Sequence, residues 1–572
     1  MRASLTFDIR EIPFSTRGSW LNLSPVVALH TVADQIHLVS HVNGMHPVFR
    51  LRLEHQGDPL DEGWWTCPDR HEWRSHHGVV AASFDGPRVL RLRGRGVQLR
   101  LTEAAGELTP FTGGYLFVDP VDQSVVLTSY ETGRRYRVRM LHGELSATGI
   151  EALGRSERSV LLGDGSGEWE AEVVEATTGV RPAGPRCGFD EVVETAAEAF
   201  ATYADLVAPE RADAPAGRLA AYTIWSATVA PEGMLARESV LMSKHWMDKV
   251  WSWDHCFNAL ALASHPDLAL DQFLAPFDHQ DESGALPDSV THSEALYNYV
   301  KPPIHGWAFA RLRETLPREL TRAELQLVHD RLSCWSDYWL TCRRVPGHVL
   351  PYYQHGNDSG WDNATTFDVD RVIEAPDLAT FLAVQLDVLA DLARELGHPA
   401  DRWEHESKAL VAALLDQLWT PDGFIGLGAT TGRRSGTTSL LTSMPLLLGD
   451  RLPADVRAVL ADKVRAHLTE HGLATELPTS AHYEEDGYWR GPVWAPSTAL
   501  IESGLRRSGY ADLADEVSRR FRVLCERSGF AENFGALTGV GLRDRAYTWT
   551  AAVYLTLAAA AAPRSRVPTE HP

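Results

Sequence analysis

Apolar and polar residues alternate in short runs over the first third of the chain. The runs at 90–92 and 97–101 alternate with Arg and Gln on either side of Gly94-Arg95-Gly96, and this pattern predicts a hairpin with one wet face. A third alternating run lies at 136–140. Gly, Pro and Asp clusters divide these strand-length pieces, and no long helical period interrupts them. The pattern predicts an antiparallel β-sandwich over residues 1–180.

The period changes after Arg181-Pro182-Ala183-Gly184-Pro185, a linker by composition. From Phe189 onward apolar residues follow the helical period, with Asp190 placed as an N-cap. Further helical segments are expected at 216–230, 253–264, 303–315, 321–343, 376–397, 399–419, 437–448, 453–470, 492–508, 510–528 and 546–562. Strand–helix alternation and a fixed repeat are both missing, which disfavours a parallel α/β sheet and a solenoid. About a dozen helices fit a closed ring of helical hairpins, an (α/α)6 toroid.

We therefore expect a multidomain protein, as the length of 572 residues also indicates. The predicted parts are a β-sandwich accessory domain at 1–180, a linker and first helix at 181–215, an all-α (α/α)6 barrel at 190–563 and a flexible tail at 564–572. In such a toroid the long loops between hairpins gather at one mouth.

Charge and cysteine usage narrow the choice of partners and compartment. The formal net charge is −22, from 54 Lys plus Arg against 76 Asp plus Glu, so neither nucleic acid nor an anionic membrane is expected as a partner. Six scattered cysteines without a C-x-x-C pair indicate buried thiols in a reducing compartment. The N-terminus lacks a signal-peptide pattern, and no apolar run reaches membrane-spanning length. We expect a soluble, cytoplasmic protein, and the oligomeric state stays open.

One loop concentrates unusual chemistry. Residues 352–367 read YYQHGNDSGWDNATTF, with glycines and asparagines that break any helical or strand period. The loop also holds Trp361, Phe367 and two aspartates four positions apart, Asp358 and Asp362. Aromatic faces stack on sugar rings, and carboxylates handle hydroxyls and protons, so the loop indicates a sugar site. The alternative is that both aspartates only cap turns.

Other stretches repeat this mixture of Trp or Tyr with charged side chains. They lie at 249–257, 277–288, 301–307, 487–494 and 531–539. Gathered at the mouth of a toroid, they describe a pocket with an acidic floor and aromatic walls, and the chain's 18 tryptophans agree with binding surfaces beyond the core. The loop histidines lack metal-site spacing, and nucleotide-binding glycine motifs are missing, so no metal and no cofactor are expected.

Four ordered motifs carry a resemblance to a known family. They are VWSWDHCF at 250–257, NDSGWDN at 357–363, YWRGPVW at 488–494, and ENF with a following TG at 532–539, ahead of YTWTAA. On these motifs the chain resembles glycoside hydrolase family 63 and its neighbours, including the mannosylglycerate and glucosylglycerate hydrolases, and more distantly the family 37 trehalases. The likeness covers the helical half. The sandwich resembles the accessory N-terminal domain of some members more loosely.

The resemblance implies hydrolysis of a small α-linked glucoside or mannoside with inversion at the anomeric carbon. It assigns Asp362 as general acid, Glu532 as general base and Asp254 as a ligand of sugar hydroxyls, and it has Gly360 letting the sugar approach the backbone. The other substrate-binding residues it implies are Trp251, Trp253, Trp361, Tyr488, Trp489, Arg490 and Trp494. Inverting hydrolysis needs a protonated and an ionised carboxyl roughly 6.5–9.5 Å apart, with water between the sugar and the base.

Several alternatives stay open. Asp358 is a rival for the acid, because it stands where many members have glutamate. KPPIHGWA at 301–308 replaces the trehalase Gln-Trp-Asp run, which disfavours trehalose without excluding it. Arg490 either contacts a carboxylate-bearing aglycone or organises its loop through an ion pair, and Asp254 could instead pair with Lys249. Toroids of this kind also host sugar epimerases and polysaccharide lyases, and a non-catalytic carbohydrate-binding protein is a third reading.

Overall fold

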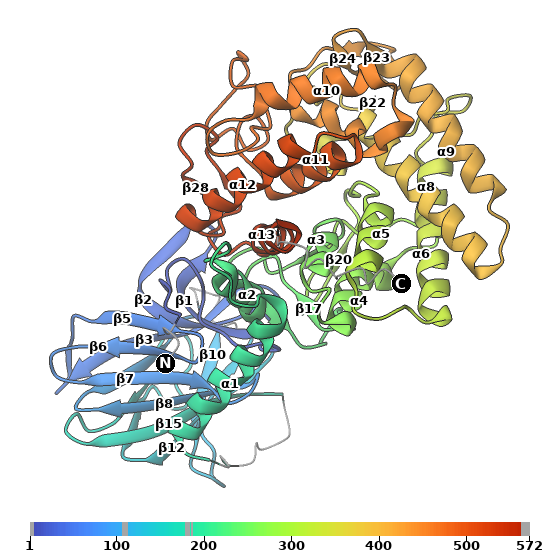
Figure 1. The fold of residues 1–572 in the computed structure, drawn as a ribbon. Helices are drawn as coiled ribbons and strands as arrows, with labels where there is room; N and C mark the ends of the chain where they lie inside the picture. The colour runs from blue at the N-terminus through green and yellow to red at the C-terminus, as the bar shows by residue number, and fades with distance from the viewer. Residues whose placement is uncertain (1–4, 106–112, 178–183, 185–186, 562–572) are drawn as a thin grey trace, which may run out of the picture.

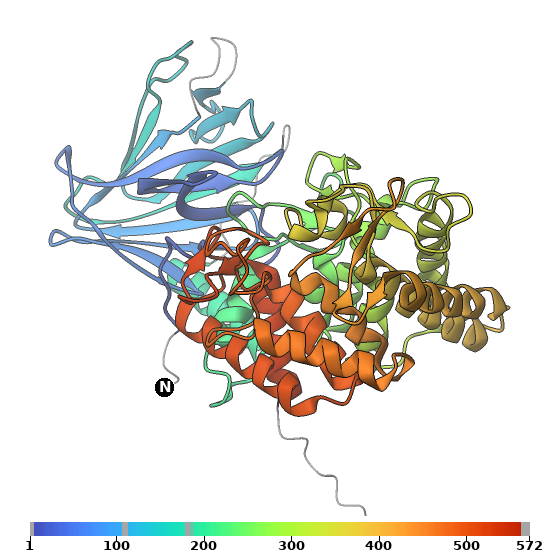
Figure 2. The ribbon, with the colours of Figure 1, turned by 90° about the horizontal axis from the view of Figure 1, so that it is seen from above.

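The computed structural model describes residues 5–105, 113–177, 184 and 187–561. A β-rich half lies at one side of a helical half (Figures 1 and 2). The predicted linker, apart from Gly184, and the predicted tail at 564–572 lie outside the described residues, and the domain limits stay a prediction. None of the helices in the described part is long and apolar enough to cross a membrane.

Two antiparallel sheets make up the β-rich half. One sheet has the order β1 (Leu21–Ala28), β2 (Thr31–Ser40), β3 (His46–His55), β9 (Gln98–Glu103), β14 (Ser159–Leu162) and β13 (Leu145–Thr148), with β4 (Asp58–Pro59) paired to β3. The other has the order β10 (Gly114–Val118), β11 (Val125–Ser129), β12 (Arg135–His142), β15 (Glu168–Ala176), β8 (Val89–Arg95), β7 (Val79–Phe84), β6 (Arg70–Arg74) and β5 (Gly63–Cys67). Their inner faces enclose one apolar core that contains Trp73, Tyr136 and Trp169. The predicted sandwich is confirmed.

The predicted hairpin around Gly94-Arg95-Gly96 is wrong. Strand β8 pairs with β15 and β7, whereas β9 pairs with β3 and β14 in the opposite sheet. The glycines therefore serve a crossing between sheets, and a Cβ at Gly94 would lie 2.2 Å from the Trp169 indole. Strand periodicity is a local property, but the partner of a strand is not, which is why the alternation was read correctly and the pairing was not.

Twelve helical segments within the described residues form a double ring. The inner ring comprises α3 (Asp254–Ala261), α5 (His305–Thr315), α8 (Pro376–Leu396), η4 (Leu440–Arg451), α11 (Ala495–Arg507) and α13 (Thr548–Ala561). The outer ring comprises α2 (Gly217–Ala227), α4 (Pro266–Leu274), α6 (Arg322–Thr341), α9 (Asp401–Ala413), α10 (Ala454–His467) and α12 (Ala511–Ser528). Helix α13 is apolar nearly all round because it is buried nearly all round. The predicted (α/α)6 architecture is confirmed.

The membership of the ring differs from the prediction. Helix α1 (Phe189–Val207), expected as the first toroid helix, packs instead on β7, β8 and α2 (Figure 1). Asp190 is not its N-cap but lies in its first turn, 2.7 Å from the Arg93 guanidinium, which also stacks over the Phe189 ring. Helix α4, which the sequence pattern did not predict, completes the outer ring behind α3.

The thiol prediction holds only in part. All six cysteines are free, and Cys67, Cys256 and Cys525 are buried as expected. Cys334 and Cys342 are exposed, because they lie on the solvent side of α6 and at its end. Burial of every thiol was therefore an incorrect expectation.

The two halves share buried contacts. Trp20 and Val42 of the sandwich lie in one apolar cluster with Val229, Leu241 and Val290 of the helical half. The Trp20 indole N–H donates to the carbonyl of Ala230 at 3.1 Å. The sandwich is therefore packed against the barrel rather than tethered to it.

The Trp169 contact gives a test of the sandwich core. We expect Gly94→Ala to lower the free energy of unfolding by about 1–3 kcal/mol, because the new methyl group overlaps the Trp169 ring in a close-packed core. Urea unfolding followed by tryptophan fluorescence measures this loss. The matched control is Gly63→Ala in β5 of the same sheet, where the nearest atom to a new Cβ is 3.9 Å away. Equal stability of both variants would contradict the packing argument.

Candidate active site

A cavity of about 220 Å³ opens at one end of the barrel. Several of the residues that line it lie at the N-terminal ends of inner helices: Asp254 begins α3, Lys301 precedes α5, Trp494 precedes α11 and Trp549 lies in the first turn of α13. Backbone N–H groups at helix N-termini lack intrahelical partners and carry partial positive charge. This end of the barrel therefore suits carboxylates and hydroxyl-bearing ligands.

The structure brings most of the predicted site residues to this cavity. Eight of them line it: Trp251, Trp253, Asp254, Gly360, Asp362, Tyr488, Trp489 and Trp494. Trp361 does not, because it is fully buried and packs against Trp489 with ring centroids 4.8 Å apart. Arg490 does not either, since its guanidinium pairs with Asp368 and donates to the carbonyl of Asn363. The loop-organising alternative for Arg490 is the one the structure contains.

Indole rings form the wall of the cavity. Trp489 and Trp494 are stacked with centroids 4.1 Å apart and planes 5° apart. Trp549 meets Trp494 edge-on at 5.5 Å and Trp253 edge-on at 6.0 Å. Aromatic pairs in these geometries stabilise one another beyond their area of contact, so the wall is rigid before any ligand binds.

Gly360 serves this wall directly. It ends the short helix α7 (Gly356–Ser359) with φ of 73°, a left-handed conformation that favours glycine. A Cβ at this position would also lie 2.4 Å from the Trp253 indole. Position 360 therefore requires glycine because the Trp253 ring, as well as any ligand in the cavity, lies close to its backbone.

The two aspartates of the central loop have different surroundings. The Asp358 carboxylate is 1% exposed and accepts hydrogen bonds from the Arg343 guanidinium at 2.8 Å and from the backbone N–H groups of Gln354 and Val300 at 2.8 and 3.2 Å. Asp362 instead lines the cavity. The geometry favours Asp362 over Asp358 as the group that meets a substrate.

Burial raises the pKa of Asp362, while the nearby Lys301 ammonium opposes this rise and the Asp288 carboxylate adds to it. A raised pKa lets a carboxyl keep its proton to higher pH, as a proton donor must.

Three carboxyl groups surround one ammonium in the cavity. Lys301 Nζ lies 3.1 Å from Asp288 Oδ1, donates to the carbonyl of Asn357 at 2.8 Å and stands over the Trp251 ring. Burial raises the pKa of Asp254, with Lys301 opposing the rise. Lys301, and not the expected Lys249, is thus the cation beside Asp254.

Asp254 also has a free acceptor. Its side chain is 4% exposed, and its Oδ2 atom finds no hydrogen-bond partner among the described residues. A buried oxygen without a partner is costly, and the cost falls when a ligand hydroxyl donates to it. A hydroxyl-bearing ligand in the cavity would find an acceptor at this point.

Glu532 lies beside the cavity without lining it. It precedes β27 (Asn533–Phe534), is 2% exposed and donates its N–H to the carbonyl of Asp544 at 2.7 Å. Burial raises the pKa of Glu532 to about 8; the Asp544 and Asp362 charges add to this, and the Arg543 guanidinium opposes it. Glu532 thus lies near enough to Asp362 for the Asp362 charge to raise its pKa.

Sequence reasoning missed several lining residues, namely Met247, Asp288, Asn298, Tyr299, Lys301, Asn357, Tyr547 and Trp549. Asp288, Lys301 and Asn357 lie inside stretches that the sequence had singled out, and Tyr547 and Trp549 belong to YTWTAA. Asn298 and Tyr299 carried no signal, because neither belongs to a motif or a periodic segment.

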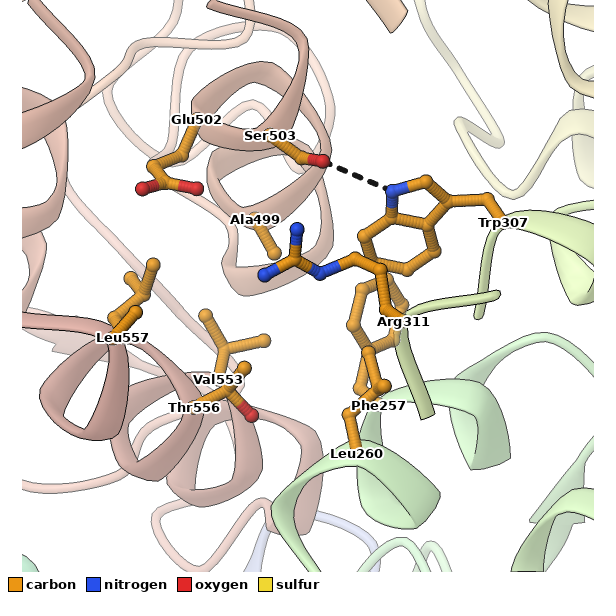
Figure 3. Close-up of a pocket in the computed structure, with 11 residues that line it drawn as sticks. Phe257, Leu260, Trp307, Arg311, Ala499, Glu502, Ser503, Val553, Thr556 and Leu557 are labelled. Carbon is orange, nitrogen blue, oxygen red and sulfur yellow. Dashed lines mark hydrogen bonds between the residues drawn. The ribbon is translucent and has the colours of Figure 1, made fainter. Parts of the chain in front are cut away.

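A second cavity lies among α3, α5, α11 and α13 (Figure 3). It is lined by side chains of these four helices, including Leu260, Arg311, Glu502 and Val553. Trp307 donates its indole N–H to Ser503 Oγ at 3.1 Å across its edge. Its volume of about 20 Å³ has room for about one water molecule, so a sugar would not fit there.

Comparison with known proteins places this site in a family. The model described as "Mannosylglycerate hydrolase MGH1-like glycoside hydrolase domain" matches residues 247–550, more than half of the chain. A mannosylglycerate hydrolase of Thermus thermophilus is 40% identical over 388 residues, which are 53% of this chain and 93% of that protein. The barrel and its cavity are those of a glycosidase. The chain belongs to the mannosylglycerate hydrolase MGH1-like glycoside hydrolases and is an O-glycosyl hydrolase.

Solved structures agree on the fold. A GH63 mannosylglycerate hydrolase of Thermus thermophilus, in complex with Tris and D-glycerate, is 21% identical, has a TM-score of 0.51 and covers 54% of this chain and 92% of its own. A bacterial glucoamylase complexed with acarbose is 10% identical, has a TM-score of 0.63 and covers 97% and 94%. The second match extends over both halves of the molecule. The epimerase, lyase and non-catalytic alternatives lose their support.

The contrast between the two loop aspartates can be tested by stability. We expect Asp358→Asn to lower the free energy of unfolding by about 3–5 kcal/mol, because it leaves the buried Arg343 charge without its partner. Thermal and urea unfolding measure the loss. The matched control is Asp362→Asn, which breaks no ion pair and should unfold like the parent protein. A stable Asp358→Asn variant would contradict the structural role of Asp358.

Proposed function

We propose that the protein is an inverting α-glycoside hydrolase acting on a small α-glucoside or α-mannoside, with Asp362 as general acid and Glu532 as general base. One observation carries the proposal. Asp362 lies in the aromatic-walled cavity, burial raises its pKa, and its charge is felt by Glu532. Inverting hydrolysis requires two carboxyl groups. Asp362 lies inside the cavity, and Glu532 lies near enough for the Asp362 charge to raise its pKa.

Each residue then has one task. Asp362 donates its proton to the glycosidic oxygen as the bond to the anomeric carbon breaks. Glu532 takes a proton from the water that attacks the opposite face of the same carbon, so the configuration inverts. The free Oδ2 of Asp254 accepts a hydrogen bond from a sugar hydroxyl, and the stacked Trp489 and Trp494 hold the ring against the wall.

The mechanism fixes the protonation states of the two carboxyls. Burial raises the pKa of both, and the Asp362 charge adds to the rise for Glu532. The productive arrangement has a proton on Asp362 and leaves Glu532 ionised. The Arg543 guanidinium favours ionised Glu532 by lowering the pKa of that group, whereas burial and the Asp544 charge oppose it.

The substrate is proposed from the cavity and the relatives together. The related T. thermophilus protein is named for mannosylglycerate, whose aglycone carries a carboxylate. Lys301 is the cation that lines the cavity here, and it is the group that such a carboxylate would approach. We propose mannosylglycerate or glucosylglycerate as substrate, with other small α-glucosides, α-mannosides and trehalose as comparisons in one hydrolysis screen.

Removing either catalytic carboxyl should abolish turnover. We expect Asp362→Asn and Glu532→Gln each to lower kcat by about 10²–10⁴-fold, the contribution of one positioned acid or base. Steady-state kinetics on the best substrate of the screen measures the loss, and thermal unfolding checks that the fold is kept. A variant that folds and retains turnover removes its residue from the mechanism.

The stereochemistry is a separate test. Proton NMR of the reaction mixture should show the β-anomer of the free sugar first, with the α-anomer following only through mutarotation. Inversion of an α-glycoside leaves no other order. Early release of the α-anomer would exclude water attack assisted by Glu532 and require a covalent intermediate.

The pH profile should reflect the pKa of Glu532. Since the base must be ionised and the acid protonated, kcat/KM of the parent protein is expected to follow a bell-shaped pH profile, with an acidic limb as Glu532 ionises and an alkaline limb as Asp362 loses its proton. Arg543→Gln removes the cation that lowers the pKa of Glu532, so the acidic limb should move to higher pH. The charged groups around Glu532 are Asp544, Arg543 and Asp362. If Arg543→Gln leaves the acidic limb unmoved, that limb does not report the ionisation of Glu532.

A further inference from the structure

The segment Ser243–Asp248 lies between the sandwich and the proposed base, and the sandwich holds it by buried hydrogen bonds. Asn22 of β1 donates from Nδ2 to the carbonyl of Lys244 at 2.6 Å. The Lys244 ammonium is 1% exposed and donates to Ser15 Oγ at 3.0 Å and to the carbonyl of Ser19. Burial lowers the pKa of Lys244, and oxygens of the sandwich take the place of water around its amine.

A second contact holds the other end of the segment. His41 Nδ1 lies 3.2 Å from Asp248 Oδ2, and His41 Nε2 lies 3.2 Å from Asn22 Nδ2. The side chains of His41, Asn22 and Asp248 are all buried. Burial lowers the pKa of His41, so the ring is neutral at physiological pH and acts through hydrogen bonds.

The same segment faces the barrel with its remaining side chains. Ser243 Oγ donates to Asp544 Oδ2, and His245 Nδ1 lies 3.1 Å from Asp544 Oδ1. Asp544 is fully buried, and its carbonyl accepts the N–H of Glu532 at 2.7 Å. Both carboxylate oxygens of Asp544 are therefore fixed from the segment, and its backbone fixes Glu532.

We propose that the N-terminal β-sandwich is a positioning part of the active site: Asn22 and His41 hold segment 243–248, and Ser243 and His245 of that segment hold Asp544 and, through it, Glu532. The inference rests on the proposed role of Glu532 as base. It gives the sandwich a task in the reaction beyond packing against the barrel.

This contact differs from the partly exposed ion pairs between the halves. Glu232 of the helical half pairs with Arg88 and Arg134 of the sandwich, and Arg88 is 46% exposed. Partly exposed ion pairs of this kind adapt to small shifts. Segment 243–248 cannot adapt to such shifts, because buried groups such as Lys244 and Asp544 would lose their hydrogen-bond partners at a large cost in free energy.

The first test separates positioning from adhesion. Asn22→Ala is expected to lower kcat at least ten-fold, with KM within two-fold of the parent value, because the base is displaced while the cavity wall is intact. The matched control, Glu232→Gln, breaks both ion pairs to Arg88 and Arg134 and should leave kcat and KM unchanged. Parent-like kcat in folded Asn22→Ala would overturn the proposal.

His41→Phe guards against a folding defect in the first variant. It keeps the ring shape, removes the hydrogen bonds to Asp248 and Asn22 and changes no charge. The same loss of kcat at constant KM is expected, with thermal unfolding as the check on folding. If His41→Phe folds and turns over like the parent protein, the proposal fails even where Asn22→Ala does not fold.

The second test asks whether the sandwich acts through Asp544. Asp544→Asn removes the charge that, after burial itself, raises the pKa of Glu532 most, so the acidic limb of kcat/KM should move to lower pH. In the double variant with Asn22→Ala, the loss of kcat should be at least five-fold smaller than the product of the single losses. Multiplicative losses would show independent action and overturn the chain of contacts.

These outcomes are distinguishable from failure of the proposed function. If Glu532→Gln hydrolyses the substrate as the parent protein does, Glu532 is not the base, whatever Asn22→Ala does. If Glu532→Gln is inactive and Asn22→Ala and His41→Phe retain full kcat, the mechanism stands and only the role of the sandwich is lost.

Discussion

Keeping ionisable groups out of water at one end of a helical ring is the constraint on which the rest of the structure depends. Asp254, Asp362 and Glu532 all have pKa values raised by burial, and a buried carboxylate is tolerated only where partners compensate its charge. N–H groups at the inner helix ends supply part of that compensation, Lys301 adds to it for Asp254 and Asp362, and Arg543 adds to it for Glu532. The stacked indoles oppose this compensation, because they exclude water from the carboxyls and so raise their pKa values. Acid–base chemistry near neutral pH needs both effects at once.

Carboxyls that look alike in the sequence differ in the partners that their oxygens have in the structure. Asp358 is as deeply buried as any of them, yet Arg343 and two backbone N–H groups occupy its oxygens. Asp254 keeps one oxygen without a partner among the described residues, and Asp544 has both oxygens held by Ser243 and His245. A carboxylate whose oxygens are all occupied holds the structure, whereas one with a free oxygen facing the cavity is available to a ligand. Among these three carboxyls, the hydrogen bonds accepted and not the depth of burial distinguish the one that is available to a ligand.

Local periodicity was enough to predict the architecture, because the hydrophobic periods of strands and helices are visible within a few residues. It failed where a property was not local. Strands β8 and β9 read as a hairpin, yet they join different sheets, and α1 read as a barrel helix, yet it packs on the sandwich. The site followed the same rule. Residues inside motifs, such as Trp489 and Trp494, were placed correctly as its wall, whereas Lys301 and Asp288 were noticed without a role, because an ion pair over 13 residues of irregular chain leaves no pattern. Asn298 and Tyr299 reach the cavity by tertiary structure alone.

The likeness to a bacterial glucoamylase over nearly the whole chain sets the sandwich in a wider context. A β-domain that recurs beside a barrel of this kind could be attached to it without any role in the active site. Partly exposed ion pairs such as Arg88 with Glu232 would suffice for that attachment. The interface of this protein contains more: the buried side chains of Lys244, His41 and Asp544 all hydrogen-bond there. Hydrogen bonds among buried groups fix geometry, because breaking one leaves a buried polar atom without its partner. These contacts make the position of the proposed base, Glu532, depend on both halves of the chain.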